Sequence, residues 1–186
     1  KTKIRKLVMN SLEKVNNLSK SDFISIFENV FEKTNWIAEK AYTLKPFLDL
    51  NSLKKTFLSI YDKCSNEQYL EIFNSHPQLA IEKIWDGNLT ELSEEEQLEA
   101  SLDLCTKEEL EEFAKLNNDY KKKFNFPFII AIAGLNKKII LGDFRYRIKK
   151  NFDEEFKEAK IQVKRIGTIR LNKIIVRLDL ILNKNN

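Results

Sequence analysis

The sequence predicts an all-α fold, and three observations support this prediction. The 186 residues include only four glycines and three prolines, so the residues that form the tight turns of β-sandwiches and barrels are scarce. Apolar residues recur every three or four positions, which is the period of an amphipathic helix. Ser65, Ser93 and Thr106 are each followed three positions later by Gln or Glu, a pair that opens helices. We therefore expect a multi-helix bundle.

The chain is expected to form a single domain. A length of 186 residues fits one folded unit, and no internal repeat or low-complexity linker divides it. The first residues are polar and weakly patterned, as poorly ordered chain ends commonly are. We expect a polar lead-in at residues 1–18, a helical domain at 19–182 and a tail at 183–186.

Four helices are predicted before residue 80. The first would be capped by Ser21, and the second should end before Pro46, because a residue that precedes proline avoids the helical conformation. The fourth opens with the pair Ser65 and Gln68 and is broken by Ser75-His76-Pro77. Their apolar positions run from Phe23 to Phe31, from Trp36 to Tyr42, from Leu53 to Tyr61 and from Tyr69 to Phe73.

A loop and two capped helices are expected next. Residues 81–92 are predicted to form the loop. Ser93 with Glu96, and Thr106 with Glu109, are capping-box pairs that would each open a helix.

The most apolar stretch, residues 124–135, is ambiguous. It contains Pro127, and it fits a buried strand, the start of a buried helix or an irregular insert, since periodicity alone does not separate these. Beyond it we expect a helix at residues 139–149 and a long one from about residue 152 to 182.

Charge is unevenly distributed, although the formal net charge is only +4. Residues 88–115 contain ten acidic and two basic residues, whereas residues 137–186 contain fourteen basic and six acidic residues. These opposite charges can pair within the fold or between subunits, and the basic end can also bind a polyanion. Solvated helix faces are the simplest explanation.

The sequence predicts a cytoplasmic protein. No apolar run reaches the roughly 20 residues that span a bilayer, and residues 1–8 lack the long apolar stretch of a secretory signal. The last three residues, Lys-Asn-Asn, are not a peroxisomal address. Cys64 and Cys105 are too few for a disulfide framework, so we expect thiols in a reducing cytosol.

Arg170 lies on the apolar stripe of the last predicted helix. That stripe runs Phe156, Ala159, Val163 and Ile166 in steps of three or four, and the next step falls on Arg170. A guanidinium needs a partner when it is buried, since a lone buried ion costs several kcal/mol. Arg170 therefore reaches the surface, pairs with a structural carboxylate, or forms a preorganised fork for an anion.

Two further residues are candidates for chemistry. His76 is the only histidine, and histidine is the one side chain whose unperturbed pKa lies near neutrality. It would carry any imidazole-based proton transfer, and an ordinary hydrogen-bonded histidine is the alternative. Glu96 occupies the place where a glutamate closes a capping box with Ser93, but a helix N-terminus also offers N–H groups to a ligand.

Several other chemistries lack the residues that they require. The sequence has no Gly-rich phosphate loop and no G-x-S-x-G motif. One histidine and two distant cysteines disfavour a zinc site. Glu94, Glu95 and Glu96 are adjacent, so they fan around a helix and do not face each other across a substrate.

A set of short motifs adds a family resemblance. The motifs are Ser75-His76-Pro77 with Leu79-Ala80, then Ser93-x-x-Glu96-Gln97 with Ala100-Ser101-Leu102, then Leu116-Asn117, Tyr120 and the run from Phe124 to Ala131. They are followed by Ile140-Leu141, Phe144, Arg147, Asn151, Glu155, Ala159, Ile166 and Arg170-Leu171. In this order, over about residues 20–172, they resemble the motifs of the OHCU decarboxylases. Ser101 and Asn125 stand where that family commonly has glycine.

The resemblance implies both a fold and a reaction. It implies an all-α bundle of the OHCU decarboxylase type, usually a homodimer, without metal or organic cofactor and without a nucleic-acid or membrane partner. The reaction would convert 2-oxo-4-hydroxy-4-carboxy-5-ureidoimidazoline (OHCU) to (S)-allantoin in urate degradation. The implied catalytic residues are His76, Glu96 and Arg170. The implied substrate-binding residues are Pro77, Ser93, Glu94, Glu95, Gln97, Phe128, Ile129, Ile130, Ala131 and Ile132.

A mechanism follows from the chemistry of that substrate. Its C=N bond can accept the electron pair that CO2 leaves behind, so no cofactor is required as an electron sink. We expect His76 to transfer the proton, Glu96 to orient His76 or hold ureido N–H groups, and Arg170 to bind the carboxylate. The alternative is a non-enzymatic helical module that binds a polyanion or an acidic protein through its basic C-terminal face.

Overall fold

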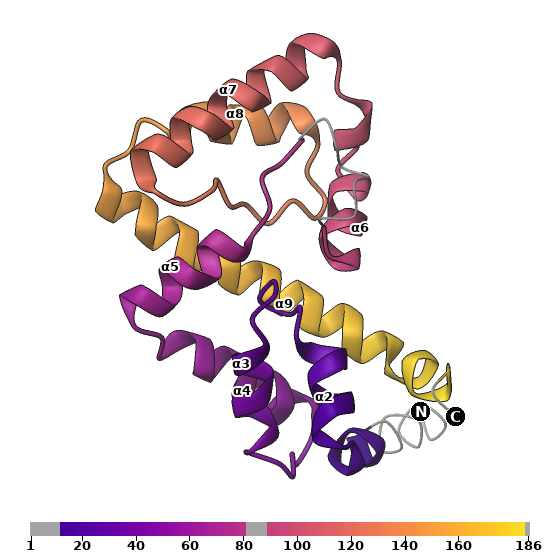
Figure 1. The fold of residues 1–186 in the computed structure, drawn as a ribbon. Helices are drawn as coiled ribbons and strands as arrows, with labels where there is room; N and C mark the ends of the chain where they lie inside the picture. The colour runs from indigo at the N-terminus through magenta and orange to yellow at the C-terminus, as the bar shows by residue number, and fades with distance from the viewer. Residues whose placement is uncertain (1–11, 81–88, 185–186) are drawn as a thin grey trace. The chain divides into compact units, whose positions relative to one another are not determined.

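The computed structural model describes residues 12–80 and 89–184, with side chains described as far as residue 178. Within these ranges the chain forms α-helices and one 3-10 turn and contains no strand, which confirms the all-α prediction. The chain divides into two compact units. Unit 1 comprises residues 1–64 and 167–186, unit 2 comprises residues 65–166, and the long helix α9 (Phe152–Lys184) contributes to both (Figure 1).

Unit 1 contains the first three predicted helices. They are α2 (Lys20–Phe27), α3 (Asn35–Tyr42) and α4 (Leu50–Asp62), and α3 ends before Pro46 as predicted. The predicted cap at Ser21 is wrong, because Ser19 caps α2 by accepting a hydrogen bond from the N–H of Asp22. Ser19 has the extended backbone that a cap requires, whereas Ser21 already lies inside the helix.

Part of the predicted lead-in is ordered. Residues 12–17 are helical and Val15 is fully buried. The side-chain amide of Asn16 donates to the carbonyl of Phe47 at 2.9 Å and accepts from its N–H at 2.8 Å. This pair of bonds joins residues that are 31 positions apart, which a weak local pattern does not reveal.

The core of unit 1 is aromatic. Phe23 and Phe27 pack against Phe57 with ring centroids 6.2 and 5.4 Å away, and Phe31 stacks on Tyr61 at 4.7 Å. Gly167 of α9 faces this core, and a Cβ there would lie 2.5 Å from the Phe31 ring. Glycine is therefore required for α9 to approach the aromatic core of its own unit.

Unit 2 is built from five helical elements and the first half of α9. The elements are α5 (Asn66–Ser75), α6 (Glu91–Glu99), the 3-10 turn η1 (Leu102–Leu104), α7 (Lys107–Phe124) and α8 (Lys137–Arg147). Helices α7 and α8 lie side by side (Figure 1). Two of the predicted capping boxes are confirmed, at the start of α5 and of α7.

The third predicted capping box is wrong. Thr90 caps α6 by accepting from the N–H of Ser93, so the helix begins one turn earlier than predicted. Ser93 lies inside the helix and is buried. Thr90 has Ser93 three positions later, whereas Ser93 has Glu96, so the capping-box pattern favoured Ser93. The predicted loop is correspondingly shorter at its end, and residues 81–88 lie outside the described residues.

The ambiguous apolar stretch is an irregular insert. After α7 ends, residues 126–132 are buried and have neither helical nor strand structure. The ring of Phe128 stacks on Phe144 at 3.9 Å, and Phe126 packs against Phe73 at 5.1 Å. A proline in this run supplies no N–H for a regular ladder. Side-chain packing therefore holds the segment in place.

Two other expectations can be compared with the described residues. None of the described helices is long and apolar enough to cross a bilayer. Cys64 and Cys105 are not joined in a disulfide.

Ser101 and Asn125, which stand where the resembled family commonly has glycine, both have a left-handed backbone conformation. Ser101 has a φ of 56° and Asn125 has a φ of 62°. The left-handed conformation costs most side chains roughly 1–2 kcal/mol, and asparagine tolerates it best after glycine. The glycines of the family pattern thus have a conformational explanation, and Ser101 is the more strained of the two replacements.

Ser101→Gly is expected to stabilise the protein by about 1 kcal/mol, because glycine adopts a positive φ without steric cost. Urea unfolding measures the change. Ser59→Gly is the matched control: Ser59 is exposed within α4, where glycine costs up to about 1 kcal/mol. A Ser101→Gly protein less stable than the parent would contradict this account of the backbone.

Candidate active site

His76 lies where the chain leaves α5. It is the C-terminal cap of that helix, with φ −72° and ψ 138°, and its N–H donates to the carbonyl of Phe73. Pro77 follows, and the residue before a proline favours this extended conformation. His76 is 7% exposed, so its imidazole is held inside unit 2 at the start of a loop. We call residues 76–80 the histidine loop.

Two side-chain amides hold the histidine loop from opposite edges. Gln97 of α6 accepts a hydrogen bond from the N–H of Ala80 at 3.1 Å and donates to the carbonyl of Gln78 at 3.4 Å. Asn117 of α7 donates to the carbonyl of Leu79 at 2.9 Å. Because successive residues of an extended chain direct their peptide groups to opposite sides, one amide serves each edge.

The loop is thereby tied to the helix that carries Glu96. Gln97 is buried, and Ser93 lies one turn before it on the same buried face of α6. Glu94, Glu95 and Glu96 are half-buried. Since Thr90 is the cap, capping does not account for the identity of Glu96. Gln97, which is predicted to bind substrate, also holds the histidine loop through its two hydrogen bonds.

A second irregular segment, residues 128–132, is held in the same manner. We call it the apolar strip. The carbonyl of Ile129 accepts from Nη1 of Arg147 at 2.8 Å, and the N–H of Ala131 donates to Oε1 of Gln162 at 2.9 Å. Both bonds lie on one edge of the strip. The N–H and C=O of Ile130 form no hydrogen bond with described residues.

Arg147 belongs to a buried ion pair beneath the apolar strip. Its Nε donates to Oε1 of Glu155 at 2.9 Å, and its Nη2 donates to the same oxygen. The hydroxyl of Tyr120 donates to that oxygen as well. Burial raises the pKa of Tyr120 far above its ordinary value, which keeps the phenol protonated. Burial would lower the pKa of Arg147, but hydrogen bonding to Glu155 raises it.

The sequence patterns did not predict a role for the residues that hold the histidine loop and the apolar strip. Asn117, Arg147 and Glu155 were noted only as parts of motifs, and Gln162 was not noted. A usable signal was present, because Glu155 and Gln162 share a face of α9 with the apolar stripe, as Arg170 does. The signal indicates burial, but it does not identify the partner.

Arg170 lies in unit 1 and is 1% exposed, so of the outcomes left open by the sequence it does not reach the surface. Its Nη1 donates to Oε2 of Glu32 at 2.7 Å and to the carbonyl of Asn29 at 2.9 Å. Of the alternatives left open by the sequence, pairing with a structural carboxylate is therefore realised. Its contact with a substrate stays a prediction.

Comparison with known proteins identifies the family. The family model described as OHCU decarboxylase matches residues 16–172. The chain belongs to the OHCU decarboxylase family. It is 30% identical to the 2-oxo-4-hydroxy-4-carboxy-5-ureidoimidazoline decarboxylase of Haloferax volcanii, over 87% of this chain and 94% of that protein. It is 34% identical to the uric acid degradation bifunctional protein of Bacillus sp. (strain TB-90), over 89% of this chain.

Solved structures share the fold. An OHCU decarboxylase crystallised in the presence of (S)-allantoin is similar with a TM-score of 0.66 and 25% identity, over 80% of this chain and 96% of that one. An (S)-allantoin synthase is similar with a TM-score of 0.69 and 23% identity, over 88% of this chain. The chain spans 32% of the length of the Bacillus protein and 53% of the (S)-allantoin synthase chain.

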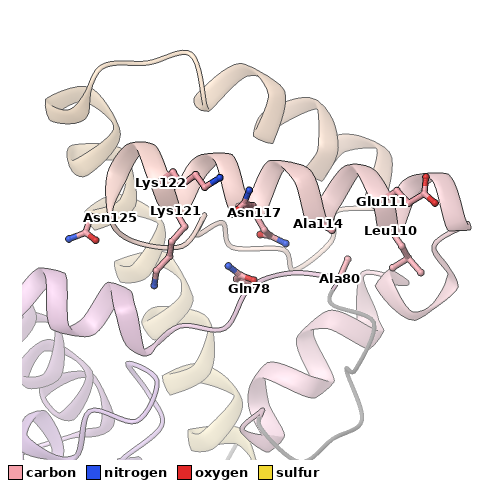
Figure 2. A pocket seen from close by; sticks show the side chains of 10 residues that line it. Gln78, Ala80, Leu110, Glu111, Ala114, Asn117, Lys121, Lys122 and Asn125 are labelled. Atoms are coloured by element: carbon pink, nitrogen blue, oxygen red, sulfur yellow. The ribbon is translucent and has the colours of Figure 1, made fainter.

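A hollow of about 680 Å³ borders the histidine loop of this family member on the α7 side. Figure 2 shows Gln78 and Ala80 on the loop alongside α7, and the other lining residues lie on α7 or, for Asn125, at its C-terminal cap. The described lining contains neither His76 nor Glu96. The Oδ1 atom of Asn117, a lining residue, is itself buried from solvent. This hollow is therefore distinct from the predicted catalytic groups.

Glu32→Gln is expected to destabilise the protein by about 3 kcal/mol or more, because it leaves the buried guanidinium of Arg170 without this carboxylate. Urea unfolding measures the loss. Glu112→Gln is the control, since it breaks an exposed pair with Arg145 and should cost less than about 1 kcal/mol. Equal, small effects of both substitutions would refute a structural role for the Glu32–Arg170 pair.

Proposed function

We propose that this family member decarboxylates OHCU and yields (S)-allantoin in urate breakdown. The observation that carries the proposal is the pair of hydrogen bonds from Gln97 to the histidine loop. These bonds join the two segments that bear His76 and Glu96 within one unit. The names of the relatives, which include an OHCU decarboxylase and a uric acid degradation protein, support the same reaction.

The reaction requires electron withdrawal and one directed proton. When the C–C bond to the carboxylate breaks, CO2 departs and the electron pair stays on the substrate, where the adjacent C=N bond accepts it. The resulting enol or enolate must then take up a proton on one face to become (S)-allantoin. The enzyme's task is to hold the carboxylate out of the ring plane and to deliver that proton.

His76 is the proposed proton donor. It is the only histidine, and the extended backbone between α5 and Pro77 holds it in a buried position. A positioned general acid of this kind accelerates a reaction by about 10²- to 10⁴-fold. Glu96 would orient His76 or accept ureido N–H groups, and Arg170 would bind the departing carboxylate, with Glu32 holding its guanidinium.

The remaining predicted residues would bind the substrate. The ureido group has N–H donors and a carbonyl acceptor, and the peptide of Ile130 offers the complementary pair on the unoccupied edge of the apolar strip. Phe128, Ile129, Ala131 and Ile132 are buried beside it and would exclude water, which favours loss of charge as CO2. Pro77, Ser93, Glu94, Glu95 and Gln97 would complete the site.

The alternative of a polyanion-binding module has less support. Lys137 and Arg145 of the basic segment pair with Glu109 and Glu112 of the acidic segment, at 2.6 Å in each case. The opposite charges thus meet within unit 2. Arg147 and Arg170 are buried in their own ion pairs. A homodimer is part of the proposal and has the family resemblance as its support, and a cytoplasmic location is proposed with it.

Circular dichroism of freshly generated OHCU tests the reaction. OHCU decays spontaneously, so the expected result is a faster change together with the signal of (S)-allantoin when the protein is added. Heat-inactivated protein provides the control. An optical signal that develops no faster than in buffer would eliminate the proposed activity.

His76→Asn is expected to lower the rate of (S)-allantoin formation by at least about 100-fold, because asparagine cannot donate the proton. Stereoselectivity should be lost with the rate. Asn74→Ala is the matched control, since Asn74 is exposed on the same helix and should leave the rate within about twofold. A His76→Asn protein that forms optically active allantoin at the normal rate would exclude His76 as the donor.

A further inference from the structure

The ion pair of Arg147 and Glu155 is fully buried, although a buried ion pair adds little net stability. The two side chains are 1% and 0% exposed. Removing two charges from water is so unfavourable that well-packed apolar residues often replace a buried pair without loss of stability. An apolar residue at position 147 would be unable to hold a backbone carbonyl. The contact of Arg147 with Ile129 is therefore the feature that requires a guanidinium.

The guanidinium fork has a fixed orientation. Nε and Nη2 both donate to Oε1 of Glu155, and the Tyr120 hydroxyl donates to the same oxygen. Nη1 donates to the carbonyl of Ile129 at 2.8 Å and also lies 3.5 Å from Oδ2 of Asp143. The guanidinium carbon also lies 4.6 Å from the centroid of the Phe128 ring. A rigid, planar donor set thus holds two consecutive residues of the apolar strip.

These contacts determine which edge of the strip is available. Arg147 occupies the Ile129 carbonyl, and Gln162, itself hydrogen-bonded to Glu158 at 2.8 Å, occupies the Ala131 N–H. The intervening Ile130 peptide groups therefore point away from both anchors. If the strip shifted by one residue along its length, the Ile130 peptide groups would face Arg147 and Gln162, and the groups now bonded to those side chains would face away.

We propose that Arg147, held by Glu155 and Tyr120, is a positioning residue that fixes the apolar strip so that the Ile130 peptide faces the substrate. This inference rests on the proposed function, since it concerns how the substrate is bound. Arg147 itself contacts Glu155 and Ile129 and would not touch the substrate. Its effect would pass through the backbone of residues 129 and 130.

Steady-state kinetics with OHCU tests the proposal. Arg147→Lys keeps the positive charge, but one ammonium cannot hold Glu155 and the Ile129 carbonyl in the same planar geometry. The expected result is a KM raised about tenfold or more, with kcat changed less than about threefold, because binding through the strip is lost while His76 is intact. Tyr120→Phe removes one bond to Glu155 and keeps the ring, so its KM should rise by about two- to threefold.

The matched control is Arg145→Lys. Arg145 lies on the same helix and forms an equally short two-bond contact with Glu112, but it is exposed and does not touch the strip. Its KM should stay within about twofold of the parent. If Arg147→Lys lowers only the amount of folded protein, or changes KM no more than Arg145→Lys does, the positioning role is overturned.

Amide hydrogen exchange gives a readout that does not depend on activity. Arg147→Lys should accelerate exchange at residues 129–132 by about tenfold or more, relative to the helix at residues 50–62 in unit 1. If Arg147→Lys does not fold, Tyr120→Phe decides the question by the same measurement. A parent protein inactive on OHCU would overturn the proposed function alone, whereas unchanged exchange at residues 129–132 would overturn the positioning role alone.

Discussion

The structure depends on the need to satisfy backbone polar groups in two buried, irregular segments of an otherwise helical protein. A helix satisfies its own N–H and C=O groups, but the histidine loop and the apolar strip have no neighbouring strand among the residues that the structure describes. Side chains take the place of that strand: Gln97 and Asn117 bind the loop, and Arg147 and Gln162 bind the strip. Each buried peptide group left without such a partner would cost about 1–3 kcal/mol.

This solution leaves selected peptide groups available for a ligand. A strand inside a sheet uses both edges for its neighbours, whereas a segment held by side chains on one edge keeps the other edge open. In the apolar strip the groups without a hydrogen-bond partner among the described residues are the N–H and C=O of Ile130. Because the anchoring side chains come from α8 and α9, the irregular backbone acquires the rigidity of the helices that hold it.

The sequence predicted the helices well because their signals are local. The caps of α5 and α7 were identified from residues three positions apart. The cap of α6 was misplaced because Ser93 has a glutamate three positions later, whereas the true cap, Thr90, does not. The conformation of residues 124–135 was not predictable, since it depends on partners 18 and 31 positions away. The place of Arg170 on the apolar stripe was recognisable, but whether it is buried depends on its partner Glu32, which lies 138 positions away.

The buried face of α9 carries polar residues that are needed for specific contacts and not for stability alone. Glu155, Gln162 and Arg170 all lie on its buried face, where apolar residues would pack at less cost in desolvation. Each contributes to a different interaction: Glu155 fixes Arg147, Gln162 binds the strip, and Arg170 pairs with Glu32. Replacing one of them by a leucine would remove a buried charge or amide and leave its partner unsatisfied. An apolar replacement would therefore stabilise the protein only if both partners of the pair were replaced together. For Gln162 this is hardly possible, because its partner is a backbone N–H, which only a substitution by proline removes.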